Sequence, residues 1–242
     1  QIVVRDSAGH ETRVSVPFYA SPTLLAKDLS SFSVEAGFPR LAYGTASDGY
    51  SEQPVASATL RRGIFDWMTV EGHAEAGGGL LSGGAGAVVR TGSIGVGSAA
   101  ATVSHFRGAY GVQSHVAYET KLFGVTANAS SQMTFGPYDD LASVTATMQA
   151  TIPSSSASAA SFTGYGQNLT PLFASARPPK MLHRLSVGMP TPFDAKSFIS
   201  ASIIALKDVD GQRSKILTAS WSRELSSNAS IYATAFHDSG DR

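Results

Sequence analysis

The feature that most constrains the fold of this chain is a two-residue alternation of apolar and small polar side chains. Over Lys215–Arg223 the alternation is strict, with Leu217, Ala219 and Trp221 on one side and Thr218, Ser220 and Ser222 on the other. Side chains in a β-strand point alternately to opposite faces, so this segment predicts a strand with one apolar face and one polar face. The pattern suits a β-sandwich or a membrane β-barrel, and the choice between them largely decides the function.

Segments of the same kind recur every 10–14 residues or so, separated by turn signals rich in glycine. The expected strands are Leu29–Ala36, Val55–Arg62, Met68–Ala76, Gly84–Thr91, Ala99–Phe106, Tyr110–Glu119, Phe123–Thr134, Leu141–Ile152, Leu182–Met189, Phe198–Leu206, Lys215–Arg223 and Ala229–His237. A hairpin of Gln1–Arg5 with Glu11–Val16 precedes them. Long loops are expected over Arg40–Gln53 and Pro153–Pro179.

The strand residues are small, with Ala, Ser, Gly, Thr and Val dominating. A sandwich core normally needs bulky side chains from the inner faces of both sheets. A wide barrel fits better, because its inner wall faces water or a plug and its outer wall faces lipid. The sequence therefore predicts an all-β protein, part of a transmembrane antiparallel β-barrel.

Composition narrows the function classes. Charged residues make up 15% of the chain, and 18 basic residues balance 18 acidic ones, which argues against a nucleic-acid-binding protein. The chain has no cysteine, so it holds no disulfide framework and no thiolate metal site. It opens on a strand without an initiator Met and stops after the turn-like His237–Arg242, so we expect an internal segment of a longer protein.

Three sequence patterns resemble known binding sites, but each lacks a feature that the site requires. Gly95–Ala100 resembles a dinucleotide loop but is followed by an expected strand instead of a helix. Asp208–Gly211 begins like a calcium loop, but Ala219 stands where the twelfth-position glutamate belongs. Glu71, His73 and Glu75 share a strand face yet are too spread along it to enclose an ion.

His105 and His115 lie on separate expected strands and could approach one another, although solvated groups at a lumen or rim are the better interpretation. No nucleophile elbow and no catalytic constellation can be assembled, so we expect no enzyme and no cofactor.

One stretch resembles a known family. Three elements follow in order over Gln1–Glu11, Val16–Leu25 and Leu29–Gly37. They correspond to the patterns V-x-V-x-D-x-x-G, V-P-(F/Y)-x-x-x-x-x-L-L and L-x-x-(F/Y)-S-x-x-x-G. This block is similar to the outer-membrane usher proteins of the chaperone–usher pathway, and the remaining chain resembles generic usher barrel strands.

The resemblance implies a domain layout and a function. Residues 1–19 would be the C-terminal strands of the plug, a domain inserted in the barrel sequence that closes the pore at rest. Residues 20–28 would be a linker, and residues 29–242 part of the barrel, with ten or eleven strands or so. The usher, in the Gram-negative outer membrane, would receive chaperone–pilus subunit complexes, promote subunit polymerisation by strand addition and secrete the fibre. Its partners would be these complexes and outer-membrane lipid, with no nucleic acid and no small-molecule substrate.

The alternation also assigns faces to the expected barrel wall. A pore that passes folded subunits should be lined by small polar groups, whereas Val125, Ala127 and Ala129 would face lipid together with Leu217, Ala219 and Trp221. The candidate lumen-facing residues are Thr126, Asn128, Ser130, Thr218, Ser220 and Ser222. Two alternatives remain: another outer-membrane barrel, such as a porin or autotransporter translocator, and a surface-exposed β-sandwich adhesin.

Overall fold

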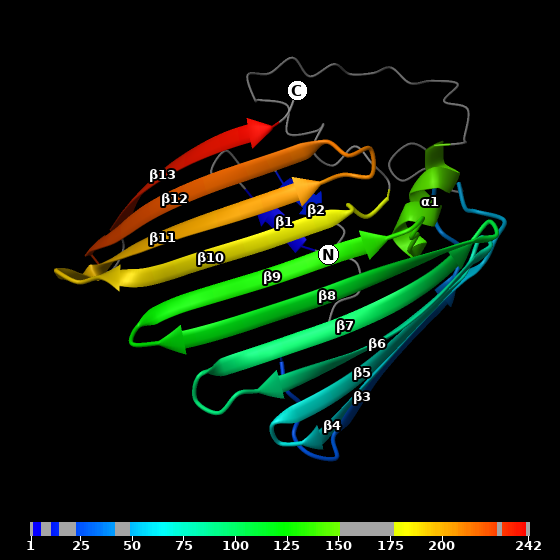
Figure 1. The fold of residues 1–242 in the computed structure, drawn as a ribbon, viewed down its shortest axis with the longest axis horizontal. Coiled ribbons are helices and arrows are strands. Elements are labelled where there is room, and N and C mark those ends of the chain that lie inside the picture. Colours follow the sequence, from blue (N-terminus) through cyan, green and yellow to red (C-terminus); the bar gives the residue numbers. More distant parts are fainter. Residues whose placement is uncertain are drawn as a thin grey trace.

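The computed structural model describes residues 2–5, 11–14, 23–41, 49–150, 177–226 and 229–240. Its main feature is one curved antiparallel sheet of eleven strands, ordered β13 to β3 without any crossover (Figure 1). The strands are β3 (Ser30–Gly37), β4 (Val55–Phe65), β5 (Met68–Gly77), β6 (Leu80–Arg90), β7 (Gly95–Phe106), β8 (Ala109–Leu122), β9 (Val125–Phe135), β10 (Met181–Thr191), β11 (Asp194–Lys207), β12 (Arg213–Ser226) and β13 (Ala229–Gly240). Each strand pairs with its neighbours in sequence, as in a β-meander, and the edge strands β3 and β13 leave the wall open.

The expected all-β fold is therefore confirmed, and eleven of the twelve strands expected after the first hairpin are present. A separate hairpin joins β1 (Ile2–Arg5) and β2 (Glu11–Val14), with Ile2 opposite Val14. The turn expected between them, and most of the loop expected over Pro153–Pro179, lie outside the described residues. Among the described residues, no helix is long and apolar enough to cross a membrane.

The strand expected over Leu141–Ile152 is wrong, because the structure has helix α1 (Leu141–Ala150) there. Its apolar residues Leu141, Val144 and Met148 follow a helical spacing, and they pack against Leu80 and Phe106 of the sheet. The alternating Ser and Thr residues that suggested a strand instead lie along the helix, where Thr145 and Thr147 donate to carbonyls one turn back.

The helix defines two faces of the sheet. We call the face on which α1 packs the helix-side face, and the opposite one the outer face. Residues two apart along a strand share a face, and so do residues directly opposite one another on paired strands. Starting from Leu80 and Phe106, which contact α1, the register therefore assigns every strand residue either to the helix-side face or to the outer face. On the outer face of β3–β13, the charged side chains that the structure describes lie close to strand ends, namely Arg62, Asp194, Lys207, Arg213, Lys215 and Arg223.

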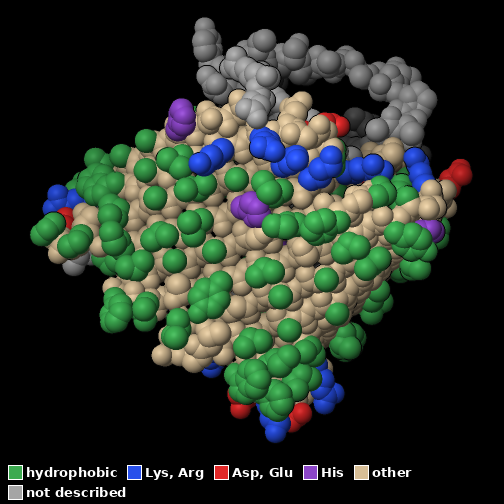
Figure 2. Space-filling model, viewed as in Figure 1, with side chains coloured by type: hydrophobic (Ala, Val, Ile, Leu, Met, Phe, Trp, Pro, Cys, Tyr) green, Lys and Arg blue, Asp and Glu red, His purple; other side chains and the backbone are tan. Residues whose placement is uncertain are grey.

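The outer face between those ends is apolar and open to its surroundings. Hydrophobic side chains spread across it (Figure 2), and many are more than one-third exposed. They include Phe32, Leu60, Leu81, Val103, Val112, Val116, Leu185, Val187, Ile203, Leu217 and Trp221. A wall with so much exposed apolar surface needs an apolar partner phase, since soluble monomers rarely expose patches of this extent.

The two ends of the wall differ in their connections. At one end the chain turns over no more than a few residues, as at 66–67, 91–94, 123–124 and 192–193. The other end has the short turns 78–79, 107–108 and 208–212, and it alone carries the long connections 38–54 and 136–180, the second of which contains α1. We call these the short-turn end and the long-loop end.

Candidate pore-lining surface

The helix-side face carries a belt of small polar side chains across its middle. In one cross-strand row, Asn128, Ser186, Ser202 and Thr218 stand next to one another on β9 to β12. The adjacent row holds Thr126, Gly188, Ser200, Ser220 and Thr234, and the Ser220 and Thr234 hydroxyls lie 3.2 Å apart. We call the polar members of these two rows the hydroxyl belt.

The six residues expected to line a lumen all lie on this one face. Thr126, Asn128, Thr218 and Ser220 belong to the hydroxyl belt. Ser130 lies beside Arg184, one row toward the long-loop end, and Ser222 lies beside Phe198, one row toward the short-turn end. Their common face follows from the register, whereas their role as a lumen lining stays a prediction.

Sequence reasoning missed the partners that complete the belt, Ser186, Ser200, Ser202 and Thr234. Each sits in an alternating strand, so the pattern that singled out Thr218 and Ser220 applied to them as well. What the sequence could not provide was the register, which decides that residues on five strands form continuous rows.

A second polar surface on the same face runs along β4 and β5. The guanidinium of Arg61 donates from Nε to Oε2 of Glu71 over 3.0 Å, and the Glu71 side chain is almost fully buried. Next along the strand, Thr59 Oγ1 and His73 Nδ1 lie 3.0 Å apart, and His73 Nε2 lies 3.1 Å from Oε1 of Glu75. The expectation that Glu71, His73 and Glu75 share a face is confirmed, and here they serve as partners for neighbouring strands and for α1.

Residues leading into β3 cross this polar surface. The backbone N–H of Leu25 donates to Oγ1 of Thr69 over 2.8 Å, and Nη2 of Arg61 donates to the carbonyl of Thr23. Gly63 on β4 has no side chain at the crossing point, where a Cβ would collide with the Ala26 carbonyl. The segment Thr23–Ala26 therefore enters the sheet from the helix-side face.

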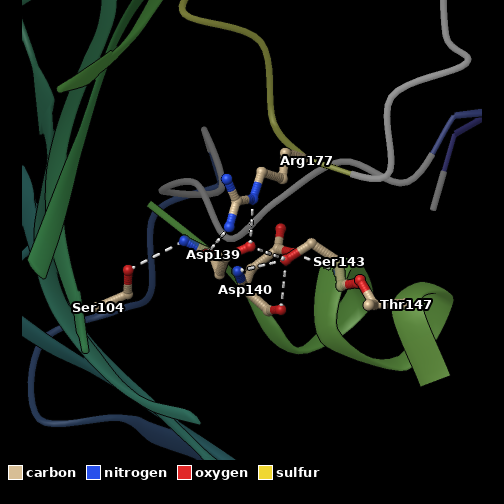
Figure 3. A network of polar contacts seen from close by, with 6 residues as sticks. All are labelled: Ser104, Asp139, Asp140, Ser143, Thr147 and Arg177. Carbon is tan, nitrogen blue, oxygen red and sulfur yellow. Dashed lines mark hydrogen bonds and ion pairs between the residues drawn. The ribbon is translucent and has the colours of Figure 1, made fainter. Parts of the chain in front are cut away.

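Helix α1 is anchored by a buried polar network at the long-loop end (Figure 3). Asp140 caps the helix, since its Oδ1 accepts the Ser143 N–H over 2.7 Å while Ser143 Oγ accepts the Asp140 N–H over 2.9 Å. Asp139 binds Arg177 through two hydrogen bonds of 2.9 and 3.1 Å, and its own N–H donates to Ser104 Oγ on β7. The network joins helix, wall and the chain entering β10.

Burial shifts the pKa of two groups at this network, Asp140 and Tyr138. Desolvation raises the pKa of the Asp140 carboxyl, and the charge of Glu75 adds to the rise, although the hydrogen bonds from Ser143 oppose it. Desolvation also raises the pKa of the neighbouring Tyr138 phenol, with further contributions from Asp140 and Glu75. The carboxylates here act as structural acceptors for a helix N-terminus, an arrangement that needs no substrate.

The sites considered from the sequence take ordinary structural places. Gly95–Ala100 lies within β7, and Asp208–Gly211 forms the turn between β11 and β12, where the Asp208 carboxylate accepts two backbone N–H groups. His105 and His115 do not approach one another, because the register puts His105 on the outer face and His115 on the helix-side face. Across the described parts of the chain, no group of three His, Asp or Glu residues is placed to hold a metal ion.

Comparison with known proteins gives a fold likeness. No protein-family description and no curated protein sequence matches the chain. Among solved structures, the translocation pore of the P pilus usher PapC matches 98% of this chain with a TM-score of 0.63 and 14% identity. A bacterial polysaccharide outer membrane secretin matches 90% with a TM-score of 0.51 and 8% identity. The chain spans 45% of the length of the usher pore and 65% of the length of the secretin. These likenesses show that it shares the wall architecture of outer-membrane β-barrels.

Proposed function

We propose that this chain forms part of the barrel wall of an outer-membrane usher, which promotes pilus subunit polymerisation and secretes the fibre through its pore. The supporting observation is the path of Thr23–Ala26, which approaches the first wall strand from the helix-side face. Along this path it contacts Arg61, Gly63 and Thr69. A linker returning from a plug inside a barrel has to enter the wall from within. A porin hairpin has no such requirement.

The two faces of the wall fit this proposal. In it, the apolar outer face contacts lipid and the helix-side face lines the pore, with Thr126, Asn128, Ser130, Thr218, Ser220 and Ser222 among the lining residues. Short hydroxyl and amide groups bind water well and offer no large apolar surface to a passing subunit. Such a lining lets folded protein slide past without tight binding.

The domain layout follows the same proposal. Residues 1–19 would close the plug, residues 20–28 would be the linker, and residues 29–242 would belong to the barrel. Partners would be periplasmic chaperone–subunit complexes, and each subunit would gain a strand from its neighbour without covalent chemistry. The likeness to a secretin keeps a different outer-membrane pore as the second candidate.

The deciding experiment uses the full-length protein, tagged and extracted from outer membranes in mild detergent. A periplasmic chaperone carrying a pilus-type subunit should co-purify with it. An outer-membrane protein that repeatedly purifies without such a complex would favour the second candidate. A protein recovered in the soluble fraction would contradict the barrel assignment itself.

A further inference from the structure

Three cations gather on the outer face at the long-loop end, and we call them the basic rim: Lys207, Arg213 and Lys215. Lys207 on β11 stands directly opposite Arg213 on β12, and Lys215 lies two residues further along the same face of β12. Figure 2 shows a row of Lys and Arg side chains along this edge of the wall. Like charges placed directly opposite one another destabilise a strand pair unless an anion compensates them.

The basic rim has no acidic partner among the residues that the structure describes. The ion pairs found there include none of its three cations, and the nearby Asp208 carboxylate accepts the N–H groups of Asp210 and Gln212. The opposite end of β12 differs, since Arg223 pairs with Asp194 over 2.8 Å. Positive charge is thus neutralised at the short-turn end and left open at the long-loop end.

An apolar hollow of about 590 Å³ lies on β10 to β13, farther from the long-loop end than the basic rim. Its lining on the outer face includes the small residues Ala201, Ala219 and Ala233 and the bulkier Met189 and Trp221. Arg213 and Ala219 are six residues apart on β12, which is about 20 Å along a strand and about 14 Å along the membrane normal at a 45° tilt. That is close to the thickness of one hydrocarbon leaflet.

The lengths of the connections indicate which membrane leaflet the basic rim contacts. Outer-membrane barrels place short turns on the periplasmic side and longer loops outside. The basic rim lies at the long-loop end, so it stands at the headgroup level of the outer leaflet. There the anionic groups are the phosphates of lipid A, the membrane anchor of lipopolysaccharide.

We propose that the basic rim and the hollow beneath it bind one phosphorylated lipid of the lipid A class. Its phosphate would lie between Lys207, Arg213 and Lys215, and an acyl chain would lie over Ala201 and Ala219. The proposal rests on the outer-membrane barrel placement proposed above and not on fibre secretion.

The test titrates lipid A into the full-length protein in detergent and counts bound lipid by native mass spectrometry. The variant K207Q/R213Q/K215Q should bind lipid A about a hundredfold more weakly, at roughly a factor of five for each lost cation. A matched control, R90Q/R107Q/K121Q, removes three cations from other parts of the wall and should bind normally. Heat-modifiable migration on gels checks that each variant is folded.

A second variant tests the hollow without changing charge. Ala219→Trp fills it and should weaken lipid A binding at least tenfold, while dephosphorylated lipid A should bind the unaltered protein as poorly as lipid A binds the triple variant. Equal binding by the triple variant and its control would overturn the proposal, and so would equal binding of the two lipids. Charge-dependent capture of an acidic protein in place of lipid A would also overturn it. If the protein secretes fibres but binds no lipid A, only this proposal fails.

Discussion

The carboxylate of Glu75, at the long-loop end of the polar surface on β4 and β5, accepts a hydrogen bond of 2.9 Å from the backbone N–H of Leu141, the first residue of α1. The two residues are 66 positions apart in the chain. A carboxylate at a helix N-terminus is favoured by the helix dipole and satisfies an amide that lacks an intrahelical partner. This contact ties α1 to the wall.

Replacing Glu75 should therefore loosen the helix. We expect Glu75→Ala to lower the free energy of local opening of α1 by roughly 1.5–3 kcal/mol, the range for hydrogen bonds to charged groups. Glu75→Gln keeps an acceptor and should cost less. Hydrogen exchange of the α1 amides in the detergent-solubilised protein measures both changes. If Glu75→Ala leaves exchange unaltered, the contact does not hold the helix.

The pH dependence of α1 should come from Asp140. Burial raises the pKa of its carboxyl, so the docked state binds the proton more tightly than the undocked state, in which the pKa is about 3.9. The stabilisation is complete below that value and is lost as the pH rises through the docked-state pKa. Protection factors of the α1 amides, corrected for intrinsic exchange, should therefore increase on acidification from neutral pH.

Two variants separate the charge from the cap. Asp140→Asn keeps a capping oxygen and removes the titrating group, so protection should stop varying with pH in this range. Ser143→Ala breaks the reciprocal cap but leaves the carboxyl, so protection should fall while its pH dependence persists. A pH dependence that survives in Asp140→Asn would show that Asp140 is not the titrating group.

The sequence was sufficient for the sheet, because alternation is a local property. Strand after strand carries it, and it put Thr218, Ser220 and Ser222 on one face correctly. It failed at Leu141–Ala150, where Ser and Thr alternate with apolar residues on a helix. The signal that could have corrected this is Asp140 with Ser143 three residues later, a capping arrangement, ahead of the helical spacing of Leu141, Val144 and Met148.

The rest depended on contacts between distant residues, which no local pattern encodes. The pairing of Arg61 with Glu71 could be suspected once the strands were assigned, but its meeting with Thr23 could not. Likewise His105 and His115 are ten positions apart with a turn between them, and only the register puts them on opposite faces.

The orientation of the wall can be tested at two neighbouring positions. Ala127 lies on the outer face of β9, and Asn128 lies on the helix-side face. If the outer face contacts lipid, Ala127→Arg should cost about 2–4 kcal/mol near the bilayer midplane, whereas Asn128→Arg should be tolerated in a wet lumen. The yield of heat-modifiable, membrane-inserted full-length protein compares the two. Equal yields would contradict the assignment of the faces.

The last prediction concerns Gly63, where Thr23–Ala26 passes over the helix-side face of the wall. A side chain at this position would collide with the Ala26 carbonyl. Gly63→Val should therefore push Thr23–Ala26 away and break the hydrogen bond from the Leu25 N–H to Thr69 Oγ1. If this segment is the linker of a plug, the displaced linker should loosen the plug. We then expect a higher resting conductance of the full-length protein in planar lipid bilayers.

Gly37→Val is the matched control for this change. Gly37 lies on the same face, on β3, and a Cβ there meets no atom within 4 Å. The control should conduct like the unaltered protein, since valine is well tolerated in strands. Equal conductance of the two variants would show that the crossing segment does not restrain a plug, and would remove the observation that favours an usher over another outer-membrane pore.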